Sequence, residues 1–358
     1  MKLAKFFALA LAALAFVACG VENTDVKPKG DAVLTANNNS VEVNTPIEFT
    51  VTAKDGTDLT AQAVIFDKSH DFVEVGNPFT PTIDGEYEFY AVVGNIITAT
   101  IKVDVVPTIP ALPEDEQPEN TAFNHRLLLV DHTGNTCGYC PQMMLALKEV
   151  AETGDYHSKY YEAMAHSYAT SDPAYSAAAA AISSHHRISS YPKLSYNFYH
   201  DVVSDTNAAH IMCQIDALWK AEGADAGIAA AATLASTSVI VNTVVKAAVA
   251  NDYRITAWLL EDGIEASQLN ATQDWMNIHN NAIRQRVDSE SLTGVDLGAI
   301  AVGETKSTAL TLKIVGNKWV RENLKVMVIV SAKNAKGKFD VVNVTICPMN
   351  DVVTYDYK

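Results

Sequence analysis

The fold of the central part of the chain is decided by the stretch Arg126-Leu127-Leu128-Leu129-Val130, followed by the loop Asp131–Thr136 and by Cys137-Gly138-Tyr139-Cys140-Pro141. The first of these is a short apolar run, which predicts a buried strand. The residues from about Pro141 to Glu152 have apolar side chains at helical spacing, which predicts a helix. The C-x-x-C sequence therefore stands between a strand and the first turn of a helix.

This position favours reactive thiols. A cysteine at a helix N-terminus is close to the positive end of the macrodipole and to unpaired N–H groups, and both stabilise a thiolate. We therefore expect Cys137 to be the nucleophile and Cys140, one turn further, to resolve a mixed disulfide. Two alternatives remain open, a permanently oxidised structural disulfide and half of a zinc site. Cys213 and Cys347 are isolated in the sequence, and they are either bridged to each other or free.

Strand and helix continue to alternate after this motif. An apolar segment, Tyr161–His166, is followed by helical patterns over about Pro173–His186 and Asn207–Ala221. The extended stretch Ser190–Tyr196 lies between those two helices. Strand–helix alternation at this spacing predicts βαβ units, so we expect an α/β domain over residues 122–226.

Strand patterns flank this domain on both sides. Between residues 32 and 106, about seven short segments alternate polar and apolar side chains, which predicts an immunoglobulin-like β-sandwich. Residues 107–121 contain four prolines among acidic residues, so we expect an extended linker without packed structure. Alternation returns over residues 227–358 and predicts a C-terminal β-sandwich. The expected fold class is multidomain α+β, with an α/β domain between two β-sandwiches.

The N-terminal end has the features of a bacterial lipoprotein signal. Two lysines precede Phe6–Ala18, an uninterrupted apolar run of 13 residues that is too short to cross a bilayer. Small residues then precede Cys19, as in a lipobox. We therefore expect residues 1–18 to be a signal peptide, Cys19 to be lipidated and residues 19–31 to be a tether. The alternative is an ordinary secretory signal with an incidental cysteine.

Composition excludes several classes of function. The chain has 26 lysines and arginines against 42 aspartates and glutamates, a net charge of −16, which disfavours binding to nucleic acid. The sequence motifs of serine hydrolases, zinc proteases, P-loop NTPases and dinucleotide-binding enzymes do not occur in a suitable context. We expect no cofactor and no metal site.

Three separated motifs resemble the thioredoxin fold and, more narrowly, the outer-membrane-protein-28-related lipoproteins of Bacteroidetes. They are the loop His132–Pro141, the turn Ser190-Tyr191-Pro192, and a C-terminal module with the segments 259–263 and 278–284. The resemblance covers about residues 122–346. It implies a thioredoxin-like central domain in a lipid-anchored protein of the outer membrane, on its periplasmic or cell-surface side.

The resemblance also implies roles for individual residues. Pro192 is expected in the cis form against the C-x-x-C, with the backbone of Tyr191–Pro192 docking an extended substrate chain. The sequence departs from the thioredoxin pattern at Thr136, where most thioredoxins have Trp. The usual buried acid near the resolving cysteine is not evident, because the strand Leu127–Val130 is wholly apolar. His132 either steadies a thiolate or lies in a solvated loop.

The favoured function is therefore thiol–disulfide exchange in the cell envelope, with protein thiols or disulfides as partners. Cys137, Cys140, Tyr191 and Pro192 are the expected site residues. The activity is that of an oxidoreductase or an isomerase, and the Cys-Gly-Tyr-Cys tetrapeptide resembles that of periplasmic disulfide isomerases. The alternative is a non-catalytic binding or structural lipoprotein of the cell surface, in which the thioredoxin fold is only a scaffold.

Overall fold

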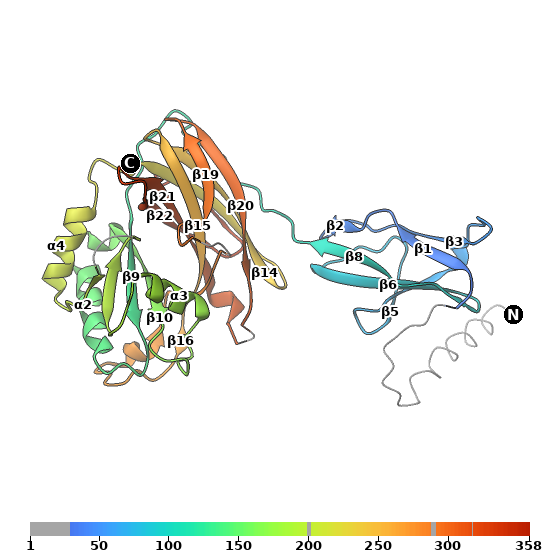
Figure 1. The fold of residues 1–358 in the computed structure, drawn as a ribbon, viewed down its shortest axis with the longest axis horizontal. Coiled ribbons are helices and arrows are strands. Elements are labelled where there is room, and N and C mark those ends of the chain that lie inside the picture. The colour runs from blue at the N-terminus through green and yellow to red at the C-terminus, as the bar shows by residue number, and fades with distance from the viewer. Residues whose placement is uncertain (1–28, 199–201, 288–290, 317) are drawn as a thin grey trace. The chain divides into compact units, whose positions relative to one another are not determined.

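A computed structural model of the chain describes residues 29–198, 202–287, 291–316 and 318–358 (Figure 1). The chain is β-rich with several sheets and divides into two compact units, one ending at Val106 and the other running from Pro107 to Lys358. No described helix is long and apolar enough to span a bilayer. The expected signal peptide 1–18 and Cys19 lie outside the described residues.

The first unit has two sheets around one core. Alternation along its strands points every second side chain inward, as Val103 and Val105 show. Phe49 and Phe89 fill the centre of the core. The larger sheet has the order β2 (Ser40–Glu42), β8 (Ile101–Val106), β6 (Gly85–Val93), β4 (Val64–Asp67) and β5 (Val73–Val75), with β7 (Ile96–Ile97) paired to β6. The smaller sheet pairs β1 (Ala32–Ala36) with β3 (Phe49–Ala53), and η1 (Thr60–Gln62) follows β3 in the chain.

One sheet of nine strands runs through the second unit. Within it β9 and β10 are parallel, whereas β11 is antiparallel to β9. Its order is β12 (Val202–Val203), β11 (Lys193–Tyr196), β9 (Leu127–Thr133), β10 (Tyr160–His166), β18 (Ala282–Arg286), β15 (Asn251–Glu261), β21 (Leu324–Lys333) and β22 (Phe339–Pro348), with β19 (Val295–Ile300) also paired to β15.

Different layers cover the two faces of this sheet. One face packs against α3 (Ala177–His185). The other packs against α2 (Cys140–Glu152) and α4 (Ala208–Leu218) at the β9 end. A four-stranded sheet covers the rest of that face, in the order β20 (Thr305–Lys313), β14 (Ser238–Ala247), β13 (Ala226–Leu234) and β23 (Val352–Val353). Short elements complete the unit, namely η2 (Tyr156–Ser158), β16 (Ile264–Glu265), η3 (Asp274–Asn277), β17 (Ile278–His279) and η4 (Arg321–Asn323).

The boundary expected between residues 226 and 227 is not a break in the structure. Met164 of β10 pairs with Ala282 of β18, so strands from both sides of that boundary share the nine-stranded sheet. Pairing between distant segments leaves no local periodicity in a sequence, which is why the pattern did not indicate it. Residues 122–226 and 227–358 therefore belong to one compact unit.

Residues 107–121 differ from the extended linker without packed structure that the prolines suggested. The side chain of Lys246 on β14 is 1% exposed, and its ammonium donates to Asp115 Oδ2 at 3.0 Å and to the carbonyl of Gln117 at 3.1 Å. Asn242 on the same strand donates to the carbonyl of Pro110 at 2.9 Å. A buried ammonium group requires such acceptors, and here they come from the proline-rich segment. That segment is therefore part of the second unit and packs against β14.

Candidate functional site

Cys137 and Cys140 form a disulfide, with the sulfur atoms 2.05 Å and the Cα atoms 5.4 Å apart. Cys140 is the first residue of α2 and Pro141 is the second, a place where proline costs no helical hydrogen bond. Cys140 is fully buried and Cys137 is 3% exposed, whereas the Tyr139 side chain between them is 71% exposed. The tetrapeptide therefore buries its disulfide and presents a tyrosine to solvent.

Asp131 is the buried acid that the sequence interpretation missed. It is fully buried, and neither of its carboxyl oxygens has a hydrogen-bond partner among the described residues. Burial raises the pKa of Asp131 well above its usual range, and the nearby carboxyl of Glu162 raises it further. Both effects favour the protonated acid.

Strand geometry directs Asp131 toward the helix that carries the cysteines. Side chains alternate along β9, so Asp131 is on the same face as Leu127 and Leu129, which pack against α2. Leu194 lies opposite Asp131 on β11 and belongs to the same cluster. The acid is therefore at the end of β9 that leads to Cys137. The alternation Leu127, Leu129, Asp131 was a signal that could have identified it from sequence.

His132 lies on the other face of the sheet, away from the layer that contains α2. Its Nδ1 is 2.8 Å from Ser183 Oγ and its Nε2 is 3.0 Å from Ser195 Oγ. Burial lowers the pKa of His132 to about 3, so the ring is neutral at physiological pH. Neither expectation for His132, a solvated loop or a contact with the thiolate, agrees with this position.

The predicted turn Tyr191-Pro192 lies at the same end of the sheet as the cysteines, and its peptide bond is cis. β11 begins directly after it, and Lys193 pairs with His132 near the end of β9. Because the two strands are antiparallel, the start of one lies beside the end of the other. The fold thus brings Tyr191 and Pro192 to the sheet end from which the C-x-x-C loop departs.

A tyrosine contact connects this turn to the loop before Cys137. The rings of Tyr191 and Tyr168 meet edge to face with centroids 5.2 Å apart. Tyr168 in turn lies so close to Gly134 that a side chain at that position would have its Cβ 2.5 Å from Tyr168 Cβ. The Tyr191 hydroxyl is also 3.1 Å from Ser167 Oγ. These contacts fix the turn against the C-x-x-C loop through packing.

A segment from the C-terminal half of the chain, Ala266–Thr272, lies over the C-x-x-C loop, and we call it the covering segment. No local pattern indicates this contact, because the two stretches are about 130 residues apart in the sequence. Three donors in a row bind three carbonyls of the loop: Gln268 Nε2 to Cys137 O at 3.0 Å, Leu269 N to Asn135 O at 2.7 Å, and Asn270 Nδ2 to Gly138 O at 3.1 Å.

A buried histidine–aspartate pair is connected to both the C-x-x-C loop and the start of the covering segment. His166 Nδ1 is 2.8 Å from Asp172 Oδ2, and the same oxygen accepts the N–H of Asn135 at 2.8 Å. Burial alone raises the pKa of Asp172, but its hydrogen bonds with His166 and Asn135 lower it below its usual range. The ring of His279 meets that of His166 edge to face at 4.8 Å and lies 3.1 Å from the carbonyl of Ala266.

The other two described cysteines are free. Cys213 is exposed on α4, and Cys347 is buried on β22, where burial raises its pKa to about 11. The bridge that the sequence left open between them is therefore not formed. Within the described ranges, no three or more His, Cys, Asp or Glu side chains form a group that could hold a metal ion.

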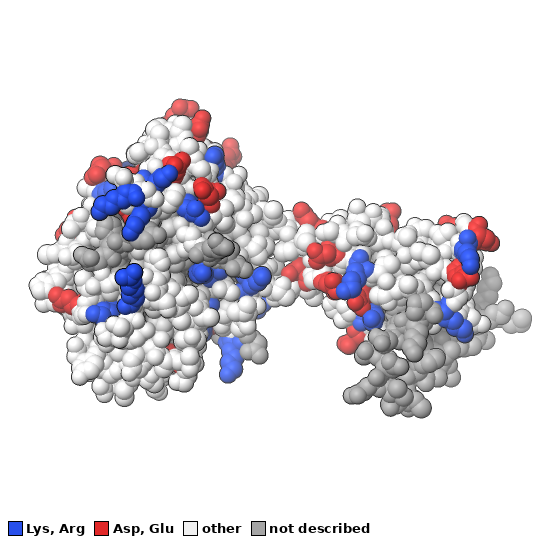
Figure 2. Space-filling view, viewed as in Figure 1, with Lys and Arg blue, Asp and Glu red and all other residues white. Residues whose placement is uncertain are grey.

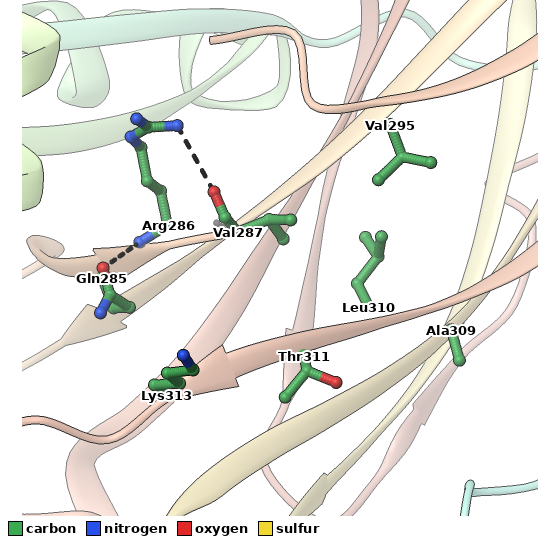
Figure 3. Close-up of a pocket in the computed structure, with 8 residues that line it drawn as sticks. All are labelled: Gln285, Arg286, Val287, Val295, Ala309, Leu310, Thr311 and Lys313. Atoms are coloured by element: carbon green, nitrogen blue, oxygen red, sulfur yellow. Dashed lines mark hydrogen bonds between the residues drawn. The ribbon is translucent and has the colours of Figure 1, made fainter. Parts of the chain in front are cut away.

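A pocket of about 450 Å³ lies among β18, β19 and β20 (Figure 3). Arg286 at its edge donates to the carbonyl of Val287 at 3.4 Å, so part of its guanidinium is engaged. The described lining residues include no cysteine, histidine or carboxylate. The lining residues are Gln285, Arg286, Val287, Val295, Ala309, Leu310, Thr311 and Lys313.

The surface near the disulfide carries few charges. The sequence has no Lys, Arg, Asp or Glu from His132 to Leu147, and none from Ala266 to Gln273. The end of the second unit where β16 lies in Figure 1 is almost entirely white in Figure 2. Tyr139, Tyr168 and Leu269 are exposed in this region. An uncharged surface with exposed aromatic and aliphatic side chains is typical of contact sites for polypeptides.

Comparisons with known proteins give a likeness in fold. No family model and no curated protein matches the chain. HBP35 of Porphyromonas gingivalis is similar, with a TM-score of 0.52 and 14% identity over 64% of this chain and 77% of that chain. Domains 4–9 of the surface layer protein SbsC align over 90% of this chain and 51% of that chain at 12% identity, but the TM-score of 0.19 is too low to support an argument. The likeness to HBP35 concerns the fold alone, and membership in the family that the sequence resembles stays a prediction.

Proposed function

We propose that the chain is a thiol–disulfide exchange protein of the cell envelope, with a thioredoxin-like core over residues 122–226. The observation that carries this proposal is the Cys137–Cys140 disulfide at the start of α2, above a sheet face that buries the unpartnered carboxyl of Asp131. Burying such a group costs stability. A purely structural disulfide does not require a buried carboxyl beside it, whereas groups with a raised pKa concentrate at functional sites.

The residues support a two-step exchange. In the reduced protein the Cys137 thiolate attacks a partner disulfide, forms a mixed disulfide and releases one partner thiolate. Cys140 then gives its proton to the Asp131 carboxylate and attacks the Cys137 sulfur, so that the Cys137–Cys140 bond forms and the second partner thiolate leaves. In the opposite direction the protonated acid returns the proton to Cys140. Burial raises the pKa of this acid, which makes its carboxylate a stronger proton acceptor for Cys140 and keeps the acid protonated for the return step.

The topology around the disulfide also supports the proposal. The C-x-x-C follows β9, and the cis Tyr191–Pro192 bond precedes β11 at the same end of the sheet. Neither the N–H nor the carbonyl of Tyr191 is bonded to another main-chain group in the described part of the chain. A partner chain in extended conformation finds a free donor and a free acceptor there, as in strand addition.

The location of the protein is part of the same proposal. Lipidation at Cys19 would hold the protein in the outer membrane, with residues 19–31 as the tether. The net charge of −16 disfavours attraction to anionic lipid headgroups, so attachment through lipid is the better match to this composition. Partners are then protein thiols or disulfides in the envelope.

The experiment that tests the function is a turnover assay with cysteine variants. We expect the wild-type protein to accelerate the reduction of insulin by dithiothreitol, and Cys137→Ser to lose that acceleration. Cys213→Ser is the matched control, because Cys213 is an exposed free thiol, and it should keep wild-type turnover. A wild-type rate no greater than that of Cys137→Ser contradicts the proposal.

One observation favours the second candidate function, a surface protein that uses the fold as a scaffold. Both cysteines are buried, and the covering segment lies over their loop. A disulfide that stays intact in millimolar dithiothreitol, even when the covering segment is loosened, supports this candidate. Rapid reduction of the loosened form supports exchange.

A further inference from the structure

We propose that the covering segment occupies the place of a substrate chain, and that Gln268 and Asn270 are specificity-determining residues of the exchange reaction. They admit to Cys137 an extended, uncharged segment of a partner polypeptide that takes over the same hydrogen bonds. This inference rests on the proposed function and names the class of its substrate.

One contact of the covering segment, Leu269 N to Asn135 O, is a main-chain bond of the kind that a docked chain makes, and the side-chain amides of Gln268 and Asn270 supply two more. Gln268, Leu269 and Asn270 supply consecutive N–H donors to carbonyls on both sides of Cys137. Main-chain carbonyls are the acceptors that an extended peptide uses when it binds beside a loop or strand. The acceptors of the C-x-x-C loop are thus already occupied from within the chain.

Gly138 gives the covering segment the room for this approach. A Cβ at residue 138 would lie 2.9 Å from Asn270 Nδ2 and 3.6 Å from Leu269 Cδ2. A contact at 2.9 Å forces a shift of the amide, so any larger residue at 138 disturbs the contact. The lack of a side chain at Gly138 therefore leaves the space that Asn270 of the covering segment occupies.

The covering segment has a fixed base and a lightly held tip. At the base, Ala266 N donates to Asn277 O at 3.0 Å, and Gln268 N donates to Asn277 Oδ1 at 2.9 Å. At the tip, Leu269 is 52% exposed and Asn270 is exposed, so few apolar contacts hold them. Segments with little buried apolar surface open at low free-energy cost. Leu269 and Asn270 can therefore move while the base stays folded, and the Gln268 side chain, which is 5% exposed, must turn away from Cys137 O before a partner takes over its hydrogen bond.

The reaction itself requires this displacement. An incoming thiolate must approach the Cys137 sulfur in line with the Cys137–Cys140 bond, and Cys137 is 3% exposed in the covered state. Attack forms a bond between the partner sulfur and Cys137, while the electron pair of the broken bond passes to Cys140, which takes a proton from Asp131. The reductant is a pair of partner thiols: the second thiolate attacks the partner sulfur of the mixed disulfide, so that a partner disulfide forms and the Cys137 thiolate leaves.

The charges near the site determine which partners are suitable. Neither the loop nor the covering segment carries a charged residue, and Tyr139 and Tyr168 present aromatic rings beside them. A charged peptide would lose hydration there without finding an opposite charge. We therefore expect an uncharged peptide with an aliphatic or aromatic residue beside its cysteine to react fastest.

The first test loosens the tip without changing its backbone. Asn270 has a φ of 62°, a conformation that glycine adopts freely, so Asn270→Gly removes the amide side chain and keeps the turn. We combine it with Gln268→Ala. Gln273→Ala is the control, because Gln273 lies just beyond the segment and its side chain bonds only Trp275 among the described residues. The measurement is the rate constant for reduction of the disulfide by dithiothreitol. Free thiols are alkylated at each time point and counted by mass spectrometry.

Two hydrogen bonds of ordinary strength correspond to roughly a thirtyfold change in an opening equilibrium. We therefore expect the double variant to be reduced about thirtyfold faster than the wild type, and the control within about twofold of it. Equal rates for the double variant and wild type overturn the proposal. Unchanged tryptophan fluorescence of the variant shows that it is folded, and Asn270→Gly alone, which leaves Gln268 in place, should still be reduced severalfold faster.

The second test concerns the substrate class. Two reduced peptides of equal length are compared, one with Gln, Leu and Asn around its cysteine and one with Glu in their place. The uncharged peptide should form a mixed disulfide with Cys137 faster at 0.5 M salt as well as at low salt, since steering by charge is screened at high salt. Equal rates at high salt overturn the assignment of substrate class. Reduction by dithiothreitol needs no insulin turnover, so failure of this inference and failure of the proposed function are separate results.

Discussion

Replacing Asp131 by asparagine should change how stability depends on pH. In the unfolded chain this carboxyl ionises near pH 3.9, whereas burial without a partner keeps it protonated far above that pH in the folded protein. Between these two pKa values the folded protein binds one proton more than the unfolded chain. The free energy of unfolding therefore falls as pH rises, by about 1.4 kcal/mol per pH unit. Asparagine has nearly the same shape and does not ionise, so the variant lacks this loss.

The second unit offers a convenient assay for this prediction. All four tryptophans, at positions 219, 258, 275 and 319, belong to it, so fluorescence reports its unfolding and not that of the first unit. Urea unfolding of the oxidised proteins is measured from pH 5 to pH 8. Burial also raises the pKa of Glu162 to about 7. This contribution is common to both proteins apart from the coupling between Glu162 and the Asp131 carboxyl, which Asp131→Asn removes.

The expected result is a stability advantage of Asp131→Asn over wild type that grows by about 1.4 kcal/mol for each pH unit until the raised pKa is reached. The buried amide has its own cost, which is independent of pH and shifts the whole curve without changing its slope. Asp274→Asn, at an exposed position, is the control and should show no trend. A difference between Asp131→Asn and wild type that is constant from pH 5 to pH 8 refutes the reasoning.

Three further changes have definite expected outcomes. Gly138→Ala places a methyl group 2.9 Å from Asn270 Nδ2, so reduction of the disulfide by dithiothreitol should become faster, and a slower rate contradicts the close fit. Lys246→Met removes the cationic partner of Asp115, which keeps its hydrogen bond from Tyr357, and should destabilise the second unit by about 3 kcal/mol in urea unfolding, with new protease cleavage in residues 107–121; an unchanged midpoint argues against this contact. Cys19→Ser should yield unprocessed precursor or a released soluble protein with an unchanged melting temperature, and retention in the membrane after correct signal cleavage would show that another surface holds it.

Local patterns in the sequence predicted the elements around the site well. The apolar run before the C-x-x-C is β9, and the helix expected from about Pro141 is α2, which begins one residue earlier at Cys140. These elements depend on periodicity and on the proline at the helix start, and both are visible in a few residues. The same periodicity places Asp131 on the buried face, so this residue was within reach of sequence reasoning.

The remaining features depend on contacts between distant segments. The pairing of β10 with β18 joins the two predicted domains into one sheet. The covering segment, which contacts the loop of the cysteines, comes from the second of those predicted domains. Neither contact changes the local pattern of the segments that make it. The buried ammonium of Lys246 likewise appears in the sequence as one polar residue in an apolar strand, and its acceptors in residues 107–121 are known only from the fold.

The most direct test of disulfide exchange is a trapping experiment with Cys140→Ser. Without the resolving thiol, the Cys137 thiolate should attack a disulfide of insulin and remain joined to it. We expect a covalent adduct that dithiothreitol reverses, and peptide mapping should locate it at Cys137 and not at the exposed Cys213. Failure to form an adduct at Cys137, in a variant whose tryptophan fluorescence shows it to be folded, would contradict the account.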